Sequence, residues 1–234
     1  MMCTSRRLAN SIFVVLWIGT QVFLAENVSY TQADDFLSWS VQHAEAIGKS
    51  TREKGRVGGM MGFRGLHTER AENYKLRATW LTPEVIRAAA RLEQIRNRLS
   101  NDKVRSIVAE AEAAGDTVVM VEIDPREGSG VIPIEWQAFL QPKDLKESNH
   151  GAVPGVNTPK LRDLKALGGV VQRDYDYDVF WLVFPLVNDR GEPLFSEATK
   201  EAELIVRIYS KEGRVSWRVP DSIRDRARNL KRRT

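Results

Sequence analysis

Three aspartates alternate with two tyrosines in the run Asp174-Tyr175-Asp176-Tyr177-Asp178. On an extended backbone the carboxylates point to one side and the tyrosines to the other. Carboxylates this close repel one another unless they are hydrated, hydrogen-bonded or bridged by a cation such as calcium. Calcium takes about six to eight oxygen ligands, and this run supplies three. The sequence therefore favours a solvated turn, with a calcium site at Asp174, Asp176 and Asp178 as the alternative.

The same carboxylates could supply the acid and base of a hydrolase. That chemistry depends on the separation of two groups and on environments that split their pKa values, which a linear sequence does not give. The chain also lacks the Gly-x-Ser-x-Gly, His-Glu-x-x-His, Cys-x-x-Cys and Walker A signatures. We predict a non-enzymatic binding or interaction domain of unknown ligand, without a cofactor. The alternative is a secreted hydrolase, assisted by calcium at the 174–178 cluster.

A second cluster of charge lies at the C-terminus, in residues 222–234. Its six basic residues are Arg224, Arg226, Arg228, Lys231, Arg232 and Arg233. Ile223, Ala227 and Leu230 have helical spacing, so a short amphipathic helix could bind an anionic surface through these cations. A frayed, solvated terminus is the prediction that the sequence favours, because chain ends are ordered only where something holds them.

Residues 1–25 carry Arg6 and Arg7, then an apolar run from Ile12 to Ile18, and end on Ala25. This order is typical of a secretory signal peptide. An uncleaved membrane anchor is the alternative, but polar residues interrupt a stretch that falls short of the roughly 20 apolar residues of a spanning helix. We predict a secreted or periplasmic protein, for which nucleic acid is not an expected partner. Cleavage would leave a mature chain without cysteine, because Cys3 is the only one.

The net charge of +4 belongs to the two ends of the chain. Residues 1–25 contribute +2 and residues 222–234 contribute +5, whereas residues 26–221 sum to −3. The basic character is therefore no evidence for a nucleic-acid-binding domain. It supports export at one end and an anion-seeking tail at the other.

Helical patterns dominate residues 26–115. The sequence predicts helices over about 31–48, from the Thr82-Pro83 start to about residue 99, and over about 102–114. Between them, the segment 51–66 is rich in glycine and arginine. It favours a flexible linker, with an anion-binding loop or an apolar contact tip as alternatives.

Strand patterns dominate residues 116–221. Residues 117–123, 134–140 and 204–219 alternate between apolar and polar side chains, and the run 179–186 is apolar on both faces. Residues 204–219 predict a hairpin with Gly213 at positive φ. A short helix is expected over residues 158–167. We predict an α+β fold: N-terminal helices, then an antiparallel β-sheet or β-sandwich of about six strands. The tryptophans on these strands are expected to pack in its core.

Overall fold

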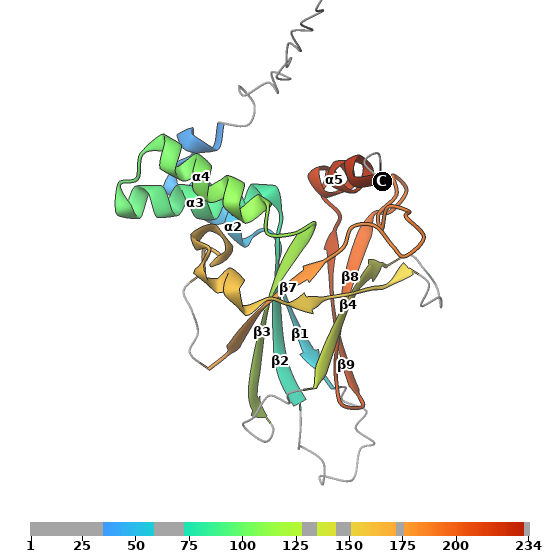
Figure 1. Ribbon diagram of the computed structural model, residues 1–234. Helices are drawn as coiled ribbons and strands as arrows, with labels where there is room; N and C mark the ends of the chain where they lie inside the picture. The colour runs from blue at the N-terminus through green and yellow to red at the C-terminus, as the bar shows by residue number, and fades with distance from the viewer. Residues whose placement is uncertain (1–34, 59–72, 128–134, 144–150, 172–175, 232–234) are drawn as a thin grey trace, which may run out of the picture. The chain divides into compact units, whose positions relative to one another are not determined.

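The computed structural model describes residues 35–58, 73–127, 135–143, 151–171 and 176–231, which belong to one compact unit (Figure 1). The helical elements are η1 (Asp35–Ser38), α2 (Val41–Lys49), α3 (Pro83–Asn97), α4 (Asn101–Glu112), η3 (Pro159–Asp163), η4 (Lys165–Leu167) and α5 (Asp221–Lys231). The strands are β1 (Arg52–Val57), β2 (Asn73–Leu81), β3 (Thr117–Glu127), β4 (Trp136–Pro142), β5 (Val153–Pro154), β6 (Val156–Asn157), β7 (Asp178–Phe184), β8 (Glu201–Ile208) and β9 (Lys211–Arg218).

The nine described strands form two antiparallel sheets. Sheet A has the order β1-β2-β3-β7-β6, and sheet B has the order β5-β4-β8-β9. The expected α+β class with antiparallel sheets is confirmed, although the strands are more numerous than the six predicted.

One hydrophobic core lies between the two sheets. Alternation places Val119, Val121 and Ile123 of β3 in this core, together with Leu204 and Val206 of β8. The opposite face of β3 carries Val118 and Met120, which belong to a second core under the helices. Strand β7 is covered on both faces, as its apolar run predicted, because Leu182 faces the first core and Trp181 packs against the second.

The helices of the second core begin where the sequence predicts. Thr82 caps α3 by accepting a hydrogen bond from Val85 N–H, and Pro83 occupies the first turn, where its missing N–H has no cost. Ser100 caps α4 in the same way. Figure 1 shows α3 and α4 side by side at one end of sheet A. Among the described helices, none combines the length and apolar character needed to cross a bilayer.

Two predictions about residues 26–115 are wrong. The segment 51–66, expected as a flexible linker, contains β1 over Arg52–Val57, whereas its residues 59–66 lie outside the described part of the chain. Strand β2 follows within a region expected to be helical. The signal for β2 is present in the sequence, because Tyr74, Leu76 and Ala78 alternate with basic residues and all three face the first core.

Strand β1 packs directly against the backbone of β9 at two glycines, Gly55 and Gly213. A Cβ atom at Gly213 of β9 would lie 2.6 Å from the Arg56 carbonyl oxygen, and one at Gly55 would lie 2.9 Å from the Arg214 carbonyl oxygen. The backbones of β1 and β9 therefore approach more closely than any side chain allows, which joins sheet A to sheet B along this side. Gly213 therefore lies within β9, where the close approach of β1 leaves no room for a side chain. The hairpin turn instead uses Tyr209, at φ 52°, so the expected positive φ at Gly213 is wrong.

Two further elements differ from prediction. The expected helix over 158–167 consists of two short 3-10 turns, η3 and η4. Of the expected helix over 31–48, residues 31–34 lie outside the described part, and the rest is divided into η1 and α2 at the Ser40 cap. Over residues 221–231 the C-terminal segment is helical rather than frayed, because α5 buries Ile223 and Ala227 completely in the first core. Helix burial of this kind stabilises an element that would be marginal alone.

Candidate functional site

The open side of the molecule lies opposite the β1–β9 junction, where a short strap connects the two sheets. Val153 and Pro154 pair with β4 in sheet B, and two residues later Val156 and Asn157 pair with β7 in sheet A. Gly155 is the crossing point: its N–H donates to the Ala138 carbonyl oxygen at 2.9 Å. The strap thus spans the gap between the sheet edges.

Glycine is required at the crossing. A Cβ atom at Gly155 would lie 2.6 Å from the Phe184 ring, so a side chain would push the strap away from the core. The strap continues into η3, where Thr158 N–H donates to the Trp181 carbonyl oxygen at 2.8 Å. These contacts fix the strap between β4 and β7.

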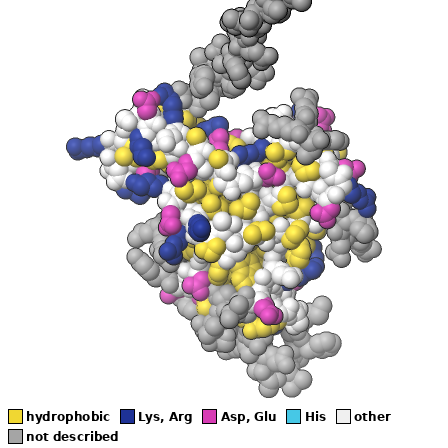
Figure 2. Space-filling view, in the orientation of Figure 1, with side chains coloured by type: hydrophobic (Ala, Val, Ile, Leu, Met, Phe, Trp, Pro, Cys, Tyr) yellow, Lys and Arg dark blue, Asp and Glu magenta, His cyan; other side chains and the backbone are white. Residues whose placement is uncertain are grey.

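Beneath the strap lies a cavity of about 350 Å³. Its lining comes from β4, the strap and β7, and consists of Trp136, Gln137, Ala138, Phe139, Pro154, Gly155, Asn157 and Leu182. Figure 2 shows hydrophobic side chains gathered over the middle of this face, where Figure 1 draws β4 and β7. A cavity of this size, whose lining combines apolar and polar surface in similar measure, can hold a small group or a side chain.

An aromatic pair closes one end of the cavity. The rings of Trp136 on β4 and Phe180 on β7 lie 4.8 Å apart in an edge-to-face arrangement. Both side chains are half-buried and pack against the first core. Trp136 belongs to the lining, and Phe180 points to the same side of β7 as the lining residue Leu182, two positions further along the strand.

The lining residues determine what the site can do. None of the eight that the structure assigns to it carries an acid, a base or a nucleophile. The side chains of Gln137 and Asn157 can donate and accept hydrogen bonds, and the Trp136 ring offers flat apolar surface. The cavity can therefore bind and orient a ligand, but its described lining cannot move a proton.

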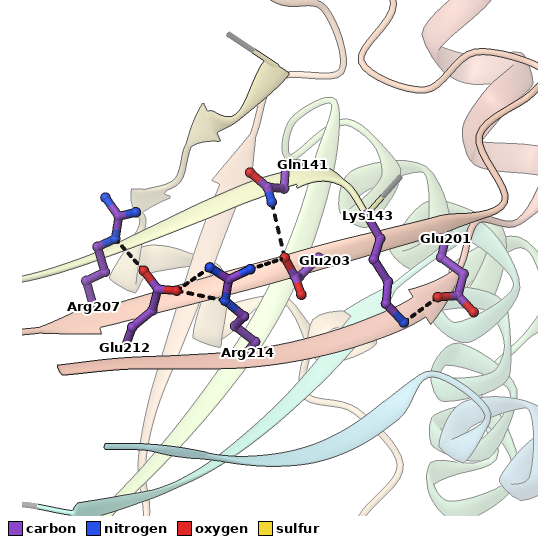
Figure 3. Close-up of polar contacts among 7 residues, drawn as sticks. All are labelled: Gln141, Lys143, Glu201, Glu203, Arg207, Glu212 and Arg214. Atoms are coloured by element: carbon purple, nitrogen blue, oxygen red, sulfur yellow. Dashed lines mark hydrogen bonds and ion pairs between the residues drawn. The ribbon is translucent and has the colours of Figure 1, made fainter. Parts of the chain in front are cut away.

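Next to the cavity, the outer face of sheet B carries a network of charged side chains (Figure 3). Arg214 lies between Glu212 and Glu203, donating to Glu203 Oε2 at 2.9 Å. Arg207 also donates to Glu212, at 2.9 Å, and its guanidinium carbon lies 5.1 Å from the Phe139 ring centroid. Gln141 donates to the same Glu203 oxygen at 3.1 Å.

This network changes the acidity of Glu212. Burial acts to raise the pKa of Glu212, but hydrogen bonds and charge from Arg207 and Arg214 outweigh it, so the pKa lies below its ordinary value. The hydrogen bond to Glu212 in turn raises the pKa of Arg214. Glu212 and Arg214 thus favour each other's ionised forms, so this pair is suited to structure rather than to acid–base catalysis.

Two buried carboxylates lie on the outer face of sheet A. Glu122 accepts hydrogen bonds from Arg52 at 3.0 and 3.3 Å and lies 4.0 Å from Arg77. Asp124 is fully buried, with Lys75 Nζ at 4.0 Å. The basic side chains of β1 and β2 thus give these two buried carboxylates neighbours of opposite charge.

The aspartate run lies at the start of β7. Asp174 is outside the described residues, whereas Asp176 and Asp178 are exposed and Tyr177 between them is 4 % exposed. The predicted alternation is therefore present over 176–178, with the Arg77 guanidinium 3.8 Å from the Tyr177 ring centroid. Within the described residues no group of three metal-binding side chains occurs, and the calcium site stays a prediction.

The basic residues of the tail are only partly described. Arg224, Arg226 and Arg228 lie on α5, Lys231 is its last residue, and Arg232 and Arg233 are outside the described residues. The three arginines have internal partners. Arg224 contacts Asp221 and the Thr199 carbonyl, Arg226 donates to the Glu112 carbonyl, and Arg228 binds Glu197 at 2.9 Å. These contacts hold α5 in place, and binding of an anionic surface stays a prediction.

Sequence reasoning did not find the cavity. It assigned Trp136 to the core and placed no element at Val153-Pro154-Gly155-Val156. The Pro-Gly pair between two β-branched residues was a local signal of a sharp chain crossing. Its position against β4 and β7 depends on contacts distant in sequence.

Fold and site together define an α+β protein with two antiparallel sheets and, at their open side, a cavity lined by aromatic, aliphatic and amide-bearing residues. No family model, curated protein or solved structure matches the chain.

Proposed function

We propose that this chain is an exported, non-enzymatic binding domain that holds its ligand in the cavity beneath the strap. The observation that carries this proposal is the lining itself: aromatic and aliphatic walls, two amide side chains, and no acid, base or nucleophile among the described residues that form it. Such a site gains affinity by removing apolar ligand surface from water, at about 25 cal/mol per Å². The amides of Gln137 and Asn157 orient the ligand.

A neutral apolar fluorophore, N-phenylnaphthylamine, tests binding in the full-length protein. We expect saturable fluorescence enhancement with one site per chain. Ala138→Phe places a ring inside the cavity and should weaken binding by at least about tenfold, since most of the apolar contact is lost. Asn157→Trp, introduced from the exposed strap, should also weaken binding without disturbing the core.

Ala198→Phe is the matched control, because Ala198 is exposed in the loop before β8 and remote from the lining. It should bind the fluorophore as the wild type does. Absence of saturable binding, or binding by both cavity variants as tight as that of the wild type, would overturn the proposal.

Export rests on residues 1–25, which lie outside the described part of the chain. N-terminal sequencing of the protein from separated cell fractions tests it. A chain beginning near Glu26 outside the cytoplasm supports export, and an intact Met1 in the cytosol contradicts it.

A further inference from the structure

The cavity beneath the strap has walls of mixed character. Its lining combines apolar and polar surface in similar measure, although none of the eight described residues that form it is charged. A purely apolar ligand would leave the polar groups of the wall without hydrogen-bond partners, at a cost in free energy. The ligand should therefore offer both apolar surface and several hydrogen-bonding groups.

The aromatic surface and one amide of the lining come from different sheets. Trp136 lies at the start of β4 in sheet B and is half-buried, so part of its indole is open to a ligand. Asn157 is exposed and pairs with Leu182 of β7 in sheet A. Directly paired residues of antiparallel strands point to the same side, so the Asn157 amide lies on the side of the lining residue Leu182. A ligand held between the two sheets can contact both the indole and the amide.

The backbone of β4 adds hydrogen-bonding groups beside the indole. The Gly155 N–H donates to the Ala138 carbonyl oxygen, so the polar backbone groups of residue 138 point toward the strap. Those of Trp136 point to the same side, because their direction repeats every second residue along a strand. Strand β5 pairs with β4 at Phe139 and Leu140, so among the described strands none pairs with Trp136 on this side. One N–H donor and one C=O acceptor therefore lie next to the aromatic surface.

Charge and size limit the ligand further. Arg207 lies outside the lining, next to the Phe139 ring, and is already paired with Glu212. The described lining thus gives an ionised ligand group no counter-charge, so an acid or an amine would lose hydration without compensation. The volume of about 350 Å³ is near the lower end of the range for ligand pockets, about 300–1,000 Å³, which favours a small and compact ligand.

We infer that the ligand of the proposed site is a neutral sugar. The inference rests on the proposed function and specifies its ligand. A pyranose ring carries C–H groups on its flat faces and hydroxyl groups around its rim, so it offers apolar and hydrogen-bonding surface at once. In the cavity, one face of the ring lies against the Trp136 indole. Each hydroxyl group both donates and accepts, which matches the Asn157 amide and the backbone groups of Trp136.

Displacement of N-phenylnaphthylamine from the full-length protein tests the inference, together with saturation-transfer NMR on the sugars themselves. The probes are the methyl pyranosides of glucose, galactose, mannose and N-acetylglucosamine. We expect at least one of them to displace the fluorophore and to bind saturably, with the strongest saturation transfer on its ring C–H protons, because these lie against the indole. Sorbitol has the hydroxyl groups of a hexose but no ring. It is the matched control ligand and should not displace the fluorophore.

Two positions of the protein separate a sugar from an apolar ligand. Asn157→Leu replaces the amide by an aliphatic side chain of similar size, so it should weaken sugar binding by about three- to tenfold without weakening fluorophore binding. Asn229→Leu makes the same change at an exposed position of α5 and should leave both affinities unchanged. Trp136→Leu should weaken sugar binding by about tenfold, whereas Trp136→Phe keeps an aromatic surface and should retain most of the affinity.

The outcomes separate the two proposals. Fluorophore binding that Ala138→Phe weakens, without displacement by any of the four glycosides, overturns the sugar inference and leaves the proposed function standing. Displacement by sorbitol as effective as that by the glycosides also overturns the inference, as does an Asn157→Leu variant that binds the sugar as tightly as the wild type. Binding of neither the fluorophore nor a sugar overturns both proposals.

Discussion

The Trp136 indole and the Phe180 ring meet at 4.8 Å and an interplanar angle of 66°, joining the edge of sheet B to the edge of sheet A. The two residues are 44 positions apart in the chain. Their contact closes one end of the cavity on the side where no continuous ladder connects the sheets among the described strands. A change in this ring pair should therefore affect both the stability of the protein and the shape of the cavity.

A double-mutant cycle on this pair should reveal their coupling. Trp136→Leu and Phe180→Leu each remove an edge-to-face contact, and we expect a coupling free energy of about 0.5–1.5 kcal/mol in urea unfolding. Both single variants should also change the affinity for N-phenylnaphthylamine, because the end of the cavity opens. Strict additivity of the two unfolding free energies would show that the rings do not stabilise each other.

The β1–β9 junction should tolerate no side chain. Gly213→Ala places a Cβ atom 2.6 Å from the Arg56 carbonyl oxygen, and we expect the free energy of unfolding to fall by more than about 2 kcal/mol. Gly168→Ala is the matched control, because its new Cβ atom would have only the Lys165 carbonyl oxygen, 3.4 Å away, as a close neighbour. Chemical denaturation of the two variants checks this difference, and equal losses would contradict it.

Helix α5 should be an integral part of the core. Ile223→Ala removes a fully buried side chain and should lower the free energy of unfolding by about 2–4 kcal/mol. Asn229→Ala changes an exposed position of the same helix and should have a small effect. Thermal unfolding followed by circular dichroism distinguishes a docked helix from a frayed tail, for which both variants would behave alike.

The network of Figure 3 should make stability depend on pH in the acid range. The pKa of Glu212 is lower in the folded protein than its ordinary value of 4.5, so its contribution is present above pH 4.5 and is lost as the pH falls through the folded pKa. Glu212→Gln should flatten this acid dependence. Glu201→Gln, on the same face but paired with Lys143, is the comparison.

Urea unfolding at a series of pH values below 5 measures the effect. A Glu212→Gln variant that loses stability on acidification as steeply as the wild type would contradict the assignment. The contribution should also decrease in high salt, because these side chains are partly exposed.

Local patterns predicted the elements whose side chains alternate clearly or follow strong caps. The start of α3 at Pro83, the strand around Val119 to Ile123 and the hairpin of β8 and β9 all follow from propensity, capping and period-two alternation. They could be predicted because these signals lie within a few residues of one another.

Other features depended on neighbours that are distant in the chain. Gly55 looked like part of a linker because the β9 backbone, which requires a glycine there, lies about 160 residues further along. The basic tail looked solvated because the core that receives Ile223 and Ala227 is formed by other strands. Asp176 and Asp178 were found by their spacing, but spacing could not show that Tyr177 between them packs under Arg77 of β2.

The sequence by itself determined the class of fold, the composition of both strand faces and the absence of the common catalytic signatures. Only the tertiary structure decided which strands become edges, that Gly155 carries the strap across Phe184, and that Trp136 and Leu182 line one cavity. The physical reason is the range of the interactions. Side-chain periodicity and helix capping depend on residues a few positions apart. A cavity is instead defined by close packing between segments that come together only when the chain folds.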